Sequence, residues 1–498
     1  MKRTAGILLP ITSLPSQYGV GCFSKSAYNF VDWLAKSGQT FWQILPLGPT
    51  GYGDSPYQSF STFAGNPYFI SLKALISEGV LTAEECDGAD FGNQADAVSY
   101  DKLYDARYAL LRKAFARSHI TENADYRNFV AENDWWLSDY ALFRAVKDQL
   151  GGVSWDHWPE DIRLRRKDAM ENYRRRLGDE ITFQQYLQFK FFEQWHALKT
   201  YANAKGIRFI GDIPIYVAMD SADTWAHPEL FQLDMDHIPV AVAGCPPDGF
   251  SAAGQLWGNP LYRWDYHRDT GYEWWISRLD YCFRLYDTVR IDHFRGFDEY
   301  YSIPRGAASA AEGHWEKGPG LSLFACLKKR LGYREVIAED LGYVTDSVRN
   351  LVRDTGFPGM KVLEFAFDSR DSGSADDYLP HNYPENSVAY TGTHDNETIA
   401  GWFSSITDKE RQMARDYLCD HFTPENRLHK SFISLVMRSN ARICVIPIQD
   451  YMGLDNRCRI NQPSTVGKNW RWRLKKEDLT EELSQEILAV TKRYGRMR

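Results

Sequence analysis

The sequence predicts an α/β fold in which a single (β/α)8 TIM barrel spans residues 1–498. Eight short apolar runs recur along the chain, helical patterns lie between most of them, and acidic residues stand where several runs end. The near-continuous apolar character of the runs is typical of parallel strands that are buried on both faces. The expected strands are residues 6–11, 40–46, 208–215, 288–294, 335–341, 360–367, 387–393 and 442–448.

Helical patterns fill most of the intervals between these runs. In residues 26–36, Phe30 and Leu34 belong to an apolar stripe at helical spacing. Thr345 is a residue type that caps helix N-termini, so a helix is expected to begin there. The other expected helices are residues 183–204, 274–285, 321–331, 345–354 and 479–494.

Two intervals are longer than one crossover helix requires. Between the second and third strands, residues 66–180 have helical and aromatic character and predict an inserted, mainly helical subdomain. Between the third and fourth strands, residues 244–260 are rich in Gly and Pro, which predicts a loop. This loop is a candidate lid over the barrel mouth, although a simple connection between elements explains its composition equally well.

Composition restricts the class of ligand. Lys and Arg number 58 against 66 Asp and Glu, so the net charge of −8 argues against general binding of nucleic acid, which needs clustered cations. Aromatic residues make up 14% of the chain, which is high. A large aromatic core explains this content, and so does a sugar-binding surface, because flat rings stack on the apolar faces of pyranoses.

The eight cysteines are scattered without CxxC spacing, so neither a zinc site nor a redox motif is indicated. Free cysteines in a long chain suit a reducing compartment. No apolar run approaches the roughly 18 residues needed to span a membrane. We therefore expect a soluble cytoplasmic protein with no membrane partner; the sequence does not indicate its oligomeric state.

Acidic residues at four strand ends form the candidate active site. Barrel enzymes place their catalytic groups at the C-terminal ends of the strands. Carboxylates occur near the ends of the third, fourth, fifth and seventh expected strands. A single one of them is often a solvated strand end or a helix cap, whereas four together are not readily ascribed to chance. They are Asp212, Asp292, Glu339 and Asp395.

Two neighbouring carboxyl groups suit retaining glycoside chemistry, which requires a separation of roughly 5–5.5 Å. Arg290 and Asp292 are two residues apart on one strand and so point to the same side, where the cation favours the ionised carboxylate that a nucleophile needs. Nearby anions and exclusion of water are expected to keep Glu339 protonated as the general acid. Asp340 is the rival acid, but it follows Glu339 directly and should point to the opposite face.

Longer motifs around these acids resemble the 4-α-glucanotransferases of glycoside hydrolase family 77, in the α-amylase clan. The resemblance runs from Ile11-Thr-Ser-Leu-Pro15 to Asn469-Trp-Arg-Trp472, nearly the whole chain. The motifs that carry it are Gly53-Asp-Ser-Pro-Tyr-Gln-Ser-Phe-Ser-Thr-Phe-Ala-Gly-Asn-Pro67, Gly211-Asp-Ile-Pro-Ile-Tyr-Val217, Arg290-Ile-Asp-His-Phe-Arg-Gly296, Ala338-Glu339 and Gly392-Thr-His-Asp-Asn-Glu-Thr398.

The resemblance implies a role for each acid: Asp292 as nucleophile, Glu339 as general acid and base, and Asp395 as the carboxylate that holds sugar hydroxyls. It also implies sugar contacts by other residues of the motifs. Tyr57 is expected to stack on the transferred sugar, with a core tyrosine as the alternative, and Asp212 is either a contact or structural support. The implied contacts are Tyr57, Arg290, His293, His394, Asn461 and Asp212.

The acceptor side of the site is expected in the predicted loop. Asp248, Gln255 and Trp257 lie there, and Trp257 is a candidate platform for the acceptor sugar. Tyr52 is a further candidate for an acceptor-side aromatic surface. Closing a loop over the site would favour a sugar hydroxyl over water as the group that receives the glycosyl unit.

The leading functional hypothesis is retaining 4-α-glucanotransfer on maltooligosaccharides and longer α-1,4-glucans, without metal or organic cofactor, because carboxylates perform the nucleophilic and proton-transfer steps. An α-1,4-glucan hydrolase of the same clan would use the same three acids. A catalytically idle glucan-binding protein would suit the aromatic content, but it would not need the full set of acids. A metal-dependent isomerase would want clustered ligands, for which His293 and His394 beside their acids are the candidates.

Overall fold

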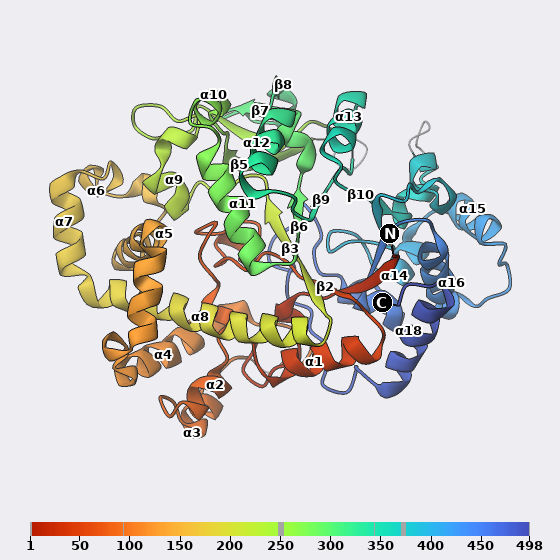
Figure 1. Ribbon diagram of the computed structural model, residues 1–498, viewed down its shortest axis with the longest axis horizontal. Coiled ribbons are helices and arrows are strands. Elements are labelled where there is room, and N and C mark those ends of the chain that lie inside the picture. Colours follow the sequence, from red (N-terminus) through yellow and green to blue (C-terminus); the bar gives the residue numbers. More distant parts are fainter. Residues whose placement is uncertain (1, 93, 248–252, 343, 370–374, 498) are drawn as a thin grey trace.

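A closed, eight-stranded parallel barrel forms the centre of the protein, as predicted (Figure 1). The computed structural model describes residues 2–92, 94–247, 253–342, 344–369 and 375–497. Around the barrel the strands follow the order β1-β12-β11-β10-β9-β6-β3-β2, with β2 pairing back to β1. They are β1 (Thr4–Leu8), β2 (Phe41–Gln43), β3 (Arg208–Pro214), β6 (Thr288–Asp292), β9 (Val336–Ala338), β10 (Gly359–Val362), β11 (Ser387–Tyr390) and β12 (Ile443–Pro447).

Both faces of the barrel strands are buried, which explains why their sequences are apolar almost throughout. Side chains such as Leu8, Ile337 and Val445 form an interior cluster. Alternate residues, such as Trp42 and Val289, belong to the larger core that the barrel shares with the surrounding helices. The alternation of the two sets along each strand follows from the two-residue period of a β-strand.

Helices surround the barrel, and those predicted from the sequence are confirmed to within a few residues at their ends. The Thr345 side chain accepts a hydrogen bond from the backbone N–H of Val348, so it caps α13 as expected. The helices around the barrel are α1 (Lys25–Lys36), α11 (Glu273–Leu285), α12 (Leu321–Leu331), α13 (Asp346–Thr355), α14 (Ile399–Ser405), α15 (Asp408–Leu418), α16 (Glu425–Arg438), α17 (Ile448–Met452) and α18 (Glu481–Arg493), of which α14, α15, α16 and α17 were not predicted.

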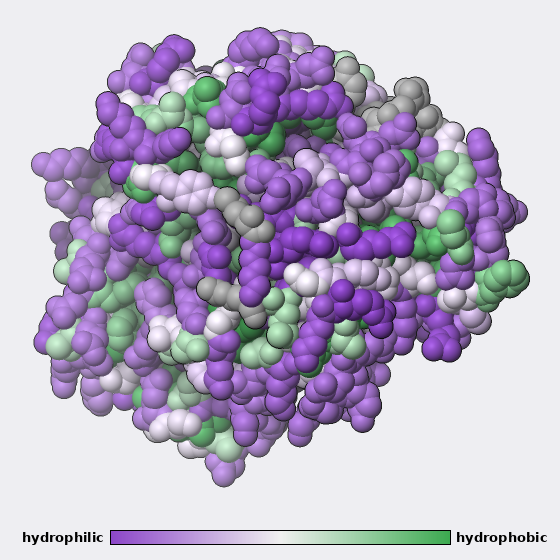
Figure 2. Space-filling model, turned by 45° about the vertical axis from the view of Figure 1, so that its right-hand side comes forward, coloured by the Kyte–Doolittle hydropathy of each residue, from purple (hydrophilic) through white to green (hydrophobic). Residues whose placement is uncertain are grey.

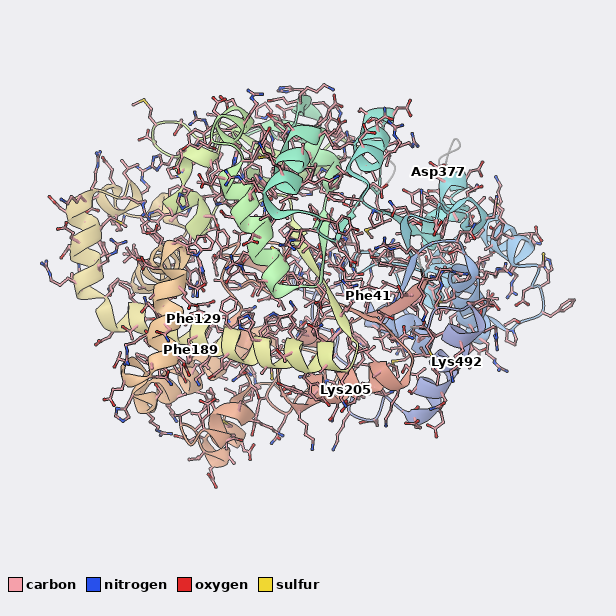
Figure 3. All side chains as sticks on the ribbon, in the orientation of Figure 1. Phe41, Phe129, Phe189, Lys205, Asp377 and Lys492 are labelled. Atoms are coloured by element: carbon pink, nitrogen blue, oxygen red, sulfur yellow. The ribbon has the colours of Figure 1, made fainter. Side chains whose placement is uncertain are left out.

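The interval between β2 and β3 is mainly helical. Its long helices α5 and α8 pack against each other through aromatic side chains, with the rings of Phe129 and Phe189 5.8 Å apart (Figure 3). Helix α8 continues into the loop before β3, so it ties this helical region to the barrel wall (Figure 1). The helices are α2 (Leu72–Ser77), α3 (Ala83–Asp87), α4 (Tyr100–Ser118), α5 (Ala124–Gln149), α6 (Glu160–Arg163), α7 (Lys167–Arg176) and α8 (Gly178–Ala204).

The prediction that residues 244–260 are a loop is wrong at both ends of the segment. Residues 244–245 and 255–260 belong to a second, antiparallel sheet of order β5-β4-β7-β8, made of β4 (Ala241–Cys245), β5 (Gln255–Pro260), β7 (Glu299–Pro304) and β8 (His314–Lys317). Gly and Pro indicated a loop, but β4 pairs with β7, which lies beyond β6 in the chain, and β5 pairs with the other edge of β4. The short helices α9 (Ala222–Ala226) and α10 (Trp264–Asp269) flank this excursion.

In the part of the chain that the structure describes, no helix combines the length and the apolar character needed to cross a membrane. On the face drawn in Figure 2, hydrophobic side chains form small, separate areas among hydrophilic ones.

Candidate active site

The barrel register places Asp292 and Glu339 side by side. Strands β6 and β9 are neighbours, and Ile291 pairs with Ala338. Asp292 is the last residue of β6 and Glu339 directly follows β9, so both carboxyl groups leave the barrel at the same level. The C-terminal ends of parallel strands meet at one mouth, which is where barrel enzymes build their active sites.

Arg290 joins two of the predicted acids. One guanidinium nitrogen, Nη1, lies 2.6 Å from Oδ2 of Asp212, and Nη2 lies 3.0 Å from Oδ1 of Asp292. Asp212 faces Arg290 across the strand pair β3 and β6. The prediction that Arg290 and Asp292 share one side of their strand is therefore confirmed.

The pKa of Asp292 is higher than its neighbouring cation alone would give. Burial raises the pKa of Asp292 to about 6, although the positive charge of Arg290 acts to lower it. The carboxylates of Asp212 and Asp395 add to the increase. The cation favours the ionised form as predicted, but the cost of removing a carboxylate from water is larger.

Two backbone N–H groups hold the carboxyl group of Glu339. His293 donates to Oε2 over 2.6 Å, and Leu341 donates to Oε1 over 2.9 Å. His293 has a φ of 53°, a left-handed conformation that is uncommon outside glycine. This turn directly after β6 aims the N–H of His293 back at the neighbouring strand end, so the backbone itself orients Glu339.

Glu339 holds its proton more strongly than an ordinary glutamate, and Asp340 does not share its position. Burial raises the pKa of Glu339 to about 7; the negative charge of Asp292 adds to the increase, whereas Arg290 opposes it. Asp340 accepts a hydrogen bond from the backbone N–H of Met360 on β10. The rival acid is thus engaged between strands and points away from Glu339, as the alternation of strand side chains predicts.

Asp395 follows β11 and is held ionised. Its Oδ2 lies 3.2 Å from Nε2 of His394, and its Oδ1 accepts a hydrogen bond of 2.6 Å from the side-chain amide of Asn461. Burial acts to raise the pKa of Asp395, but His394 and Asn461 together lower it well below its usual range. In turn, Asp395 raises the pKa of the buried His394 despite the opposing effect of burial.

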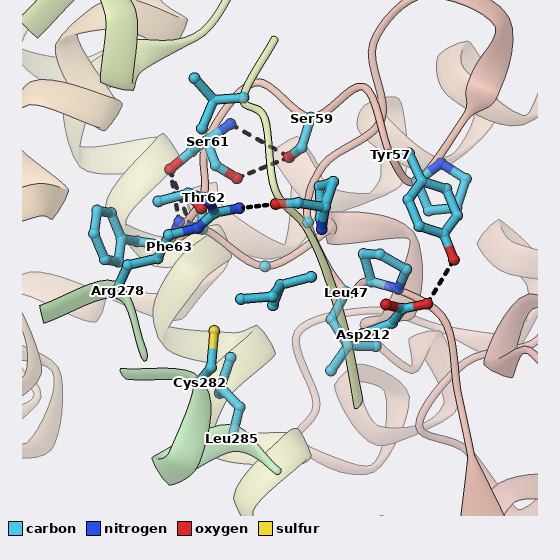
Figure 4. A pocket seen from close by; sticks show the side chains of 18 of the residues that line it. Leu47, Tyr57, Ser59, Ser61, Thr62, Phe63, Asp212, Arg278, Cys282 and Leu285 are labelled. Carbon is cyan, nitrogen blue, oxygen red and sulfur yellow. Dashed lines mark hydrogen bonds between the residues drawn. The ribbon is translucent and has the colours of Figure 1, made fainter. Parts of the chain in front are cut away.

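Tyr57 links two of these groups at the floor of the site. Its ring stacks on His394 with centroids 5.1 Å apart and an angle of 13°, and its hydroxyl donates to Oδ2 of Asp212 over 2.7 Å (Figure 4). Asp212 is 1% exposed, so it supports Tyr57 and Arg290 from below. The cavity of about 50 Å³ that borders Tyr57 and Asp212 is too small for a sugar ring.

Trp257 and Gln255 on β5 border the same mouth. The ring of Trp257 meets His293 edge-on with centroids 4.8 Å apart, and its indole N–H donates to Oε1 of Gln255 over 3.0 Å. Tyr216, which the sequence analysis did not single out, lies behind both rings, 6.2 Å from Trp257 and 6.4 Å from His293. Burial lowers the pKa of His293 to about 3, so this imidazole is neutral at physiological pH.

Two predicted residues cannot be placed in the site. Asp248 lies outside the described residues, and of Tyr52 only the backbone is described, in a short 3-10 helix over Tyr52–Asp54.

Arg459 is a site residue that sequence reasoning missed. Its Nη2 donates to the backbone oxygen of Asp395 over 2.6 Å, and its Nε donates to the backbone oxygen of Asn461 over 2.7 Å. Both bonds end on main-chain atoms, and the two segments are far apart in sequence, so no local motif marks Arg459. The arginine clamps the loop of Asp395 to the loop of Asn461.

Replacing Arg459 with Ala should lower kcat/KM by about a hundredfold, because a misplacement of about 1 Å costs that much in a preorganised site. Arg459→Lys should recover only part of this loss, since lysine cannot make both bonds with a planar fork. Arg457→Ala is the matched control, because that exposed side chain pairs with nearby Asp455 in its own loop. Equal rates for Arg459→Ala and Arg457→Ala would contradict the clamp.

Comparisons with known proteins agree with this geometry. The family model described as 4-alpha-glucanotransferase matches residues 9–480. The 4-alpha-glucanotransferase of Streptococcus pneumoniae is 47% identical over 100% of this chain and 98% of its own length, and that of Clostridium butyricum is 45% identical over 98% and 99%. The solved structure of the amylomaltase from Streptococcus agalactiae in complex with acarbose aligns over 100% of this chain and 100% of its own, with a TM-score of 0.96 and 41% identity. The chain therefore belongs to the 4-alpha-glucanotransferase family, glycoside hydrolase family 77.

Proposed function

We propose that this protein is a retaining 4-α-glucanotransferase that moves a segment of an α-1,4-glucan to the 4-hydroxyl of another glucan or of glucose, with Asp292, Glu339 and Asp395 as its catalytic residues. The observation that carries the proposal is the carboxyl pair on the adjacent strand ends of β6 and β9. Asp292 is ion-paired with Arg290, which suits a nucleophile. Glu339 has the higher pKa of the two, which suits a general acid.

In the first step, a carboxylate oxygen of Asp292 attacks the anomeric carbon of the donor glucan. The glycosidic bond breaks, its electron pair stays on the leaving oxygen, and Glu339 gives that oxygen a proton. The reducing-end fragment leaves, and the remaining segment is bound covalently to Asp292 as a glycosyl ester. Arg290 balances the charge of Asp292 before the attack.

In the second step, the 4-hydroxyl of the acceptor attacks the same anomeric carbon from the opposite side. Glu339, now ionised, takes the hydroxyl proton, and the bond to Asp292 breaks, which restores both carboxyl groups. Two displacements at one carbon give net retention of configuration. No atom or electron is required beyond those of donor, acceptor and the two carboxyl groups.

Asp395 acts as an anion throughout. Its low pKa suits a group that accepts hydrogen bonds from sugar hydroxyls and stabilises the oxocarbenium-like transition state. We assign His394 and Asn461 to the same sugar position, because both contact Asp395 directly. Tyr57 completes this position with a ring stacked on His394, and Asp212 supports it without touching the sugar.

We place the acceptor near Trp257, whose ring lies against His293 at the mouth. Gln255 fixes the indole by accepting its N–H. We retain the assignment of the whole chain to one catalytic barrel, with residues 66–180 as an inserted helical subdomain. Of the segment predicted as a lid loop, residues 253–260 are described, and we assign these to the acceptor region.

The pH dependence of kcat/KM should be bell-shaped, with its maximum between about 6 and about 7. As the pH falls through the pKa of Asp292, the nucleophile gains a proton and activity is lost. As the pH rises through the pKa of Glu339, the acid loses its proton and activity is lost again. Initial rates on maltotriose, measured over the pH range in which the protein stays folded, check both limbs of the profile. A flat alkaline limb in the native protein would contradict the assignment of Glu339.

Replacing Trp257 with Ala should lower the ratio of transfer to hydrolysis by up to about tenfold, the equivalent of one lost aromatic stack. Water then competes better for the glycosyl ester, because the acceptor is held less well. Leu256→Ala is the matched control, since that neighbour is half exposed. The ratio follows from glucose and oligosaccharide yields on maltotriose. The same ratio in both variants would remove Trp257 from the acceptor side.

Incubation of the purified protein with maltotriose, without added metal or cofactor, tests the proposed activity. Transfer predicts a ladder of longer maltooligosaccharides together with glucose. Glucose and maltose without longer products would instead identify an α-1,4-glucan hydrolase. No change with maltotriose or with longer donors would favour a glucan-binding protein without activity.

We propose maltooligosaccharides and longer α-1,4-glucans as the substrates, since the sugar position and the acceptor region are built from neutral or paired side chains. We also propose a cytoplasmic location. The buried cysteines Cys22, Cys86, Cys282 and Cys444 carry free thiols, which suits a reducing compartment.

A further inference from the structure

A second cavity lies away from the catalytic carboxyl groups. It has a volume of about 560 Å³ and opens between α10, the strands β7 and β8 and the start of α12. This volume is within the range of about 300–1,000 Å³ that is typical of small-molecule sites. None of the proposed catalytic residues lines it. The lining residues used below are Arg263, Arg268, Lys317, Asp265, Tyr300 and Gln232.

Two cations on the rim of this cavity are not neutralised. Arg263 directly precedes α10, Arg268 lies in the last turn of α10, and both residues are exposed. Within the described parts of the chain, neither guanidinium takes part in an ion pair. Lys317 also borders the cavity, but it is already 2.6 Å from Glu299. Arginine presents a planar fork of donors that matches phosphate oxygens.

The inner wall carries groups that bind hydroxyls. Tyr300 is 5% exposed; its hydroxyl accepts from Gln232 over 3.0 Å and donates to Glu316 over 2.6 Å. The amide nitrogen of Gln232 also donates to the backbone oxygen of Tyr262 over 3.2 Å, so Gln232 offers its Oε1 as an acceptor for a ligand hydroxyl. The carboxylate of Asp265 faces the same cavity and is an acceptor only. A strongly anionic polymer would be repelled by Asp265, whereas a ligand with one phosphate and several hydroxyls satisfies both the arginines and the carboxylate.

We propose that this cavity binds a phosphate monoester of a sugar, with Arg263 and Arg268 on the phosphate and with Asp265 and Gln232 on the hydroxyls. The ligand differs in charge from the neutral glucans of the transfer reaction, so this is a separate binding site. The proposal does not depend on the assignment of Asp292, Glu339 and Asp395.

Calorimetric titration of the full chain tests this site. The probes are α-D-glucose 1-phosphate, inorganic phosphate and maltose, each against the native protein and the double variant Arg263→Ala/Arg268→Ala. Arg305→Ala is the matched control, because it removes an exposed arginine after β7 that does not line the cavity. Transfer from maltotriose, measured in parallel, should be unchanged in all three proteins and shows that they are folded.

Glucose 1-phosphate should bind the native protein and the control more tightly than inorganic phosphate does. In the double variant its Kd should rise at least about tenfold, the loss expected when charge-assisted hydrogen bonds are removed. Salt should weaken the native interaction, because exposed charges are screened.

Three results would overturn the proposal. One is no binding of glucose 1-phosphate, or binding that the double variant retains. Another is inorganic phosphate binding as tightly as glucose 1-phosphate, which would leave no role for the sugar. The third is maltose binding that the double variant loses equally, which would make the cavity a neutral glucan site. Failure of the transfer reaction itself would show separately, in the maltotriose assay.

Discussion

Replacing Asp292 with Asn should reduce glucan transfer by at least about 10⁴-fold, the scale seen when a covalent nucleophile is removed. The amide keeps the shape of the carboxyl group but cannot form the glycosyl ester. The fold should persist, because Arg290 retains its bond of 2.6 Å to Asp212 and the amide oxygen still faces the guanidinium. Initial rates on maltotriose measure the loss of transfer, and thermal unfolding measures whether the fold persists.

Asp212→Asn is the matched control for the nucleophile. It removes the other carboxylate on Arg290, so it changes the local charge equally without removing the attacking group. We expect a much smaller loss than in Asp292→Asn. Near-native turnover by folded Asp292→Asn, or equal losses in both variants, would contradict the role of Asp292.

Replacing Glu339 with Gln should lower cleavage of maltotriose by about 10²–10⁴-fold, the usual contribution of a general acid. The loss should depend on the leaving group. A glycosyl fluoride releases fluoride without needing a proton, so its first step should be nearly unaffected. The alkaline limb of the pH profile should also disappear, since the group that lost its proton is gone. Fluoride release from the glycosyl fluoride and glucose release from maltotriose, measured in parallel, show how the loss depends on the leaving group.

Asp340→Asn tests the rival acid next to Glu339. Its carboxylate bonds the backbone N–H of Met360, so the substitution should lower stability more than the rate. Equal sensitivity to both leaving groups in Glu339→Gln, together with a leaving-group effect in Asp340→Asn, would exchange the two assignments.

The barrel could be predicted because its signals are local. Strands buried on both faces are apolar throughout, and the predicted strands agree with the observed β1, β6 and β11 to within a few residues. The neighbouring positions of Asp292 and Glu339 followed from strand order alone, since consecutive strands in such a barrel are adjacent. The alternation of side chains along a strand also predicted that Asp340 points away from Glu339.

Other features depend on contacts between distant segments. Strands β4 and β5 were predicted as a loop because the sheet depends on the pairing of β4 with β7, which comes only after β6. Arg459 acts on the backbone of Asp395 and Asn461, which leaves no pattern of residue types. The pKa of Asp292 was expected to be low because the sequence shows its cation, whereas the burial that outweighs this cation is a property of the packed site.

The most direct test of the account is the mass of the protein after reaction with an α-maltosyl fluoride whose terminal 4-hydroxyl is blocked, so that it cannot serve as acceptor. In Glu339→Gln, the ester forms without the acid but turns over slowly without the base. The account predicts an added maltosyl unit on the peptide that contains Asp292. A label on another residue, or fluoride release in which no covalent adduct ever accumulates, would contradict transfer through a glycosyl ester on Asp292.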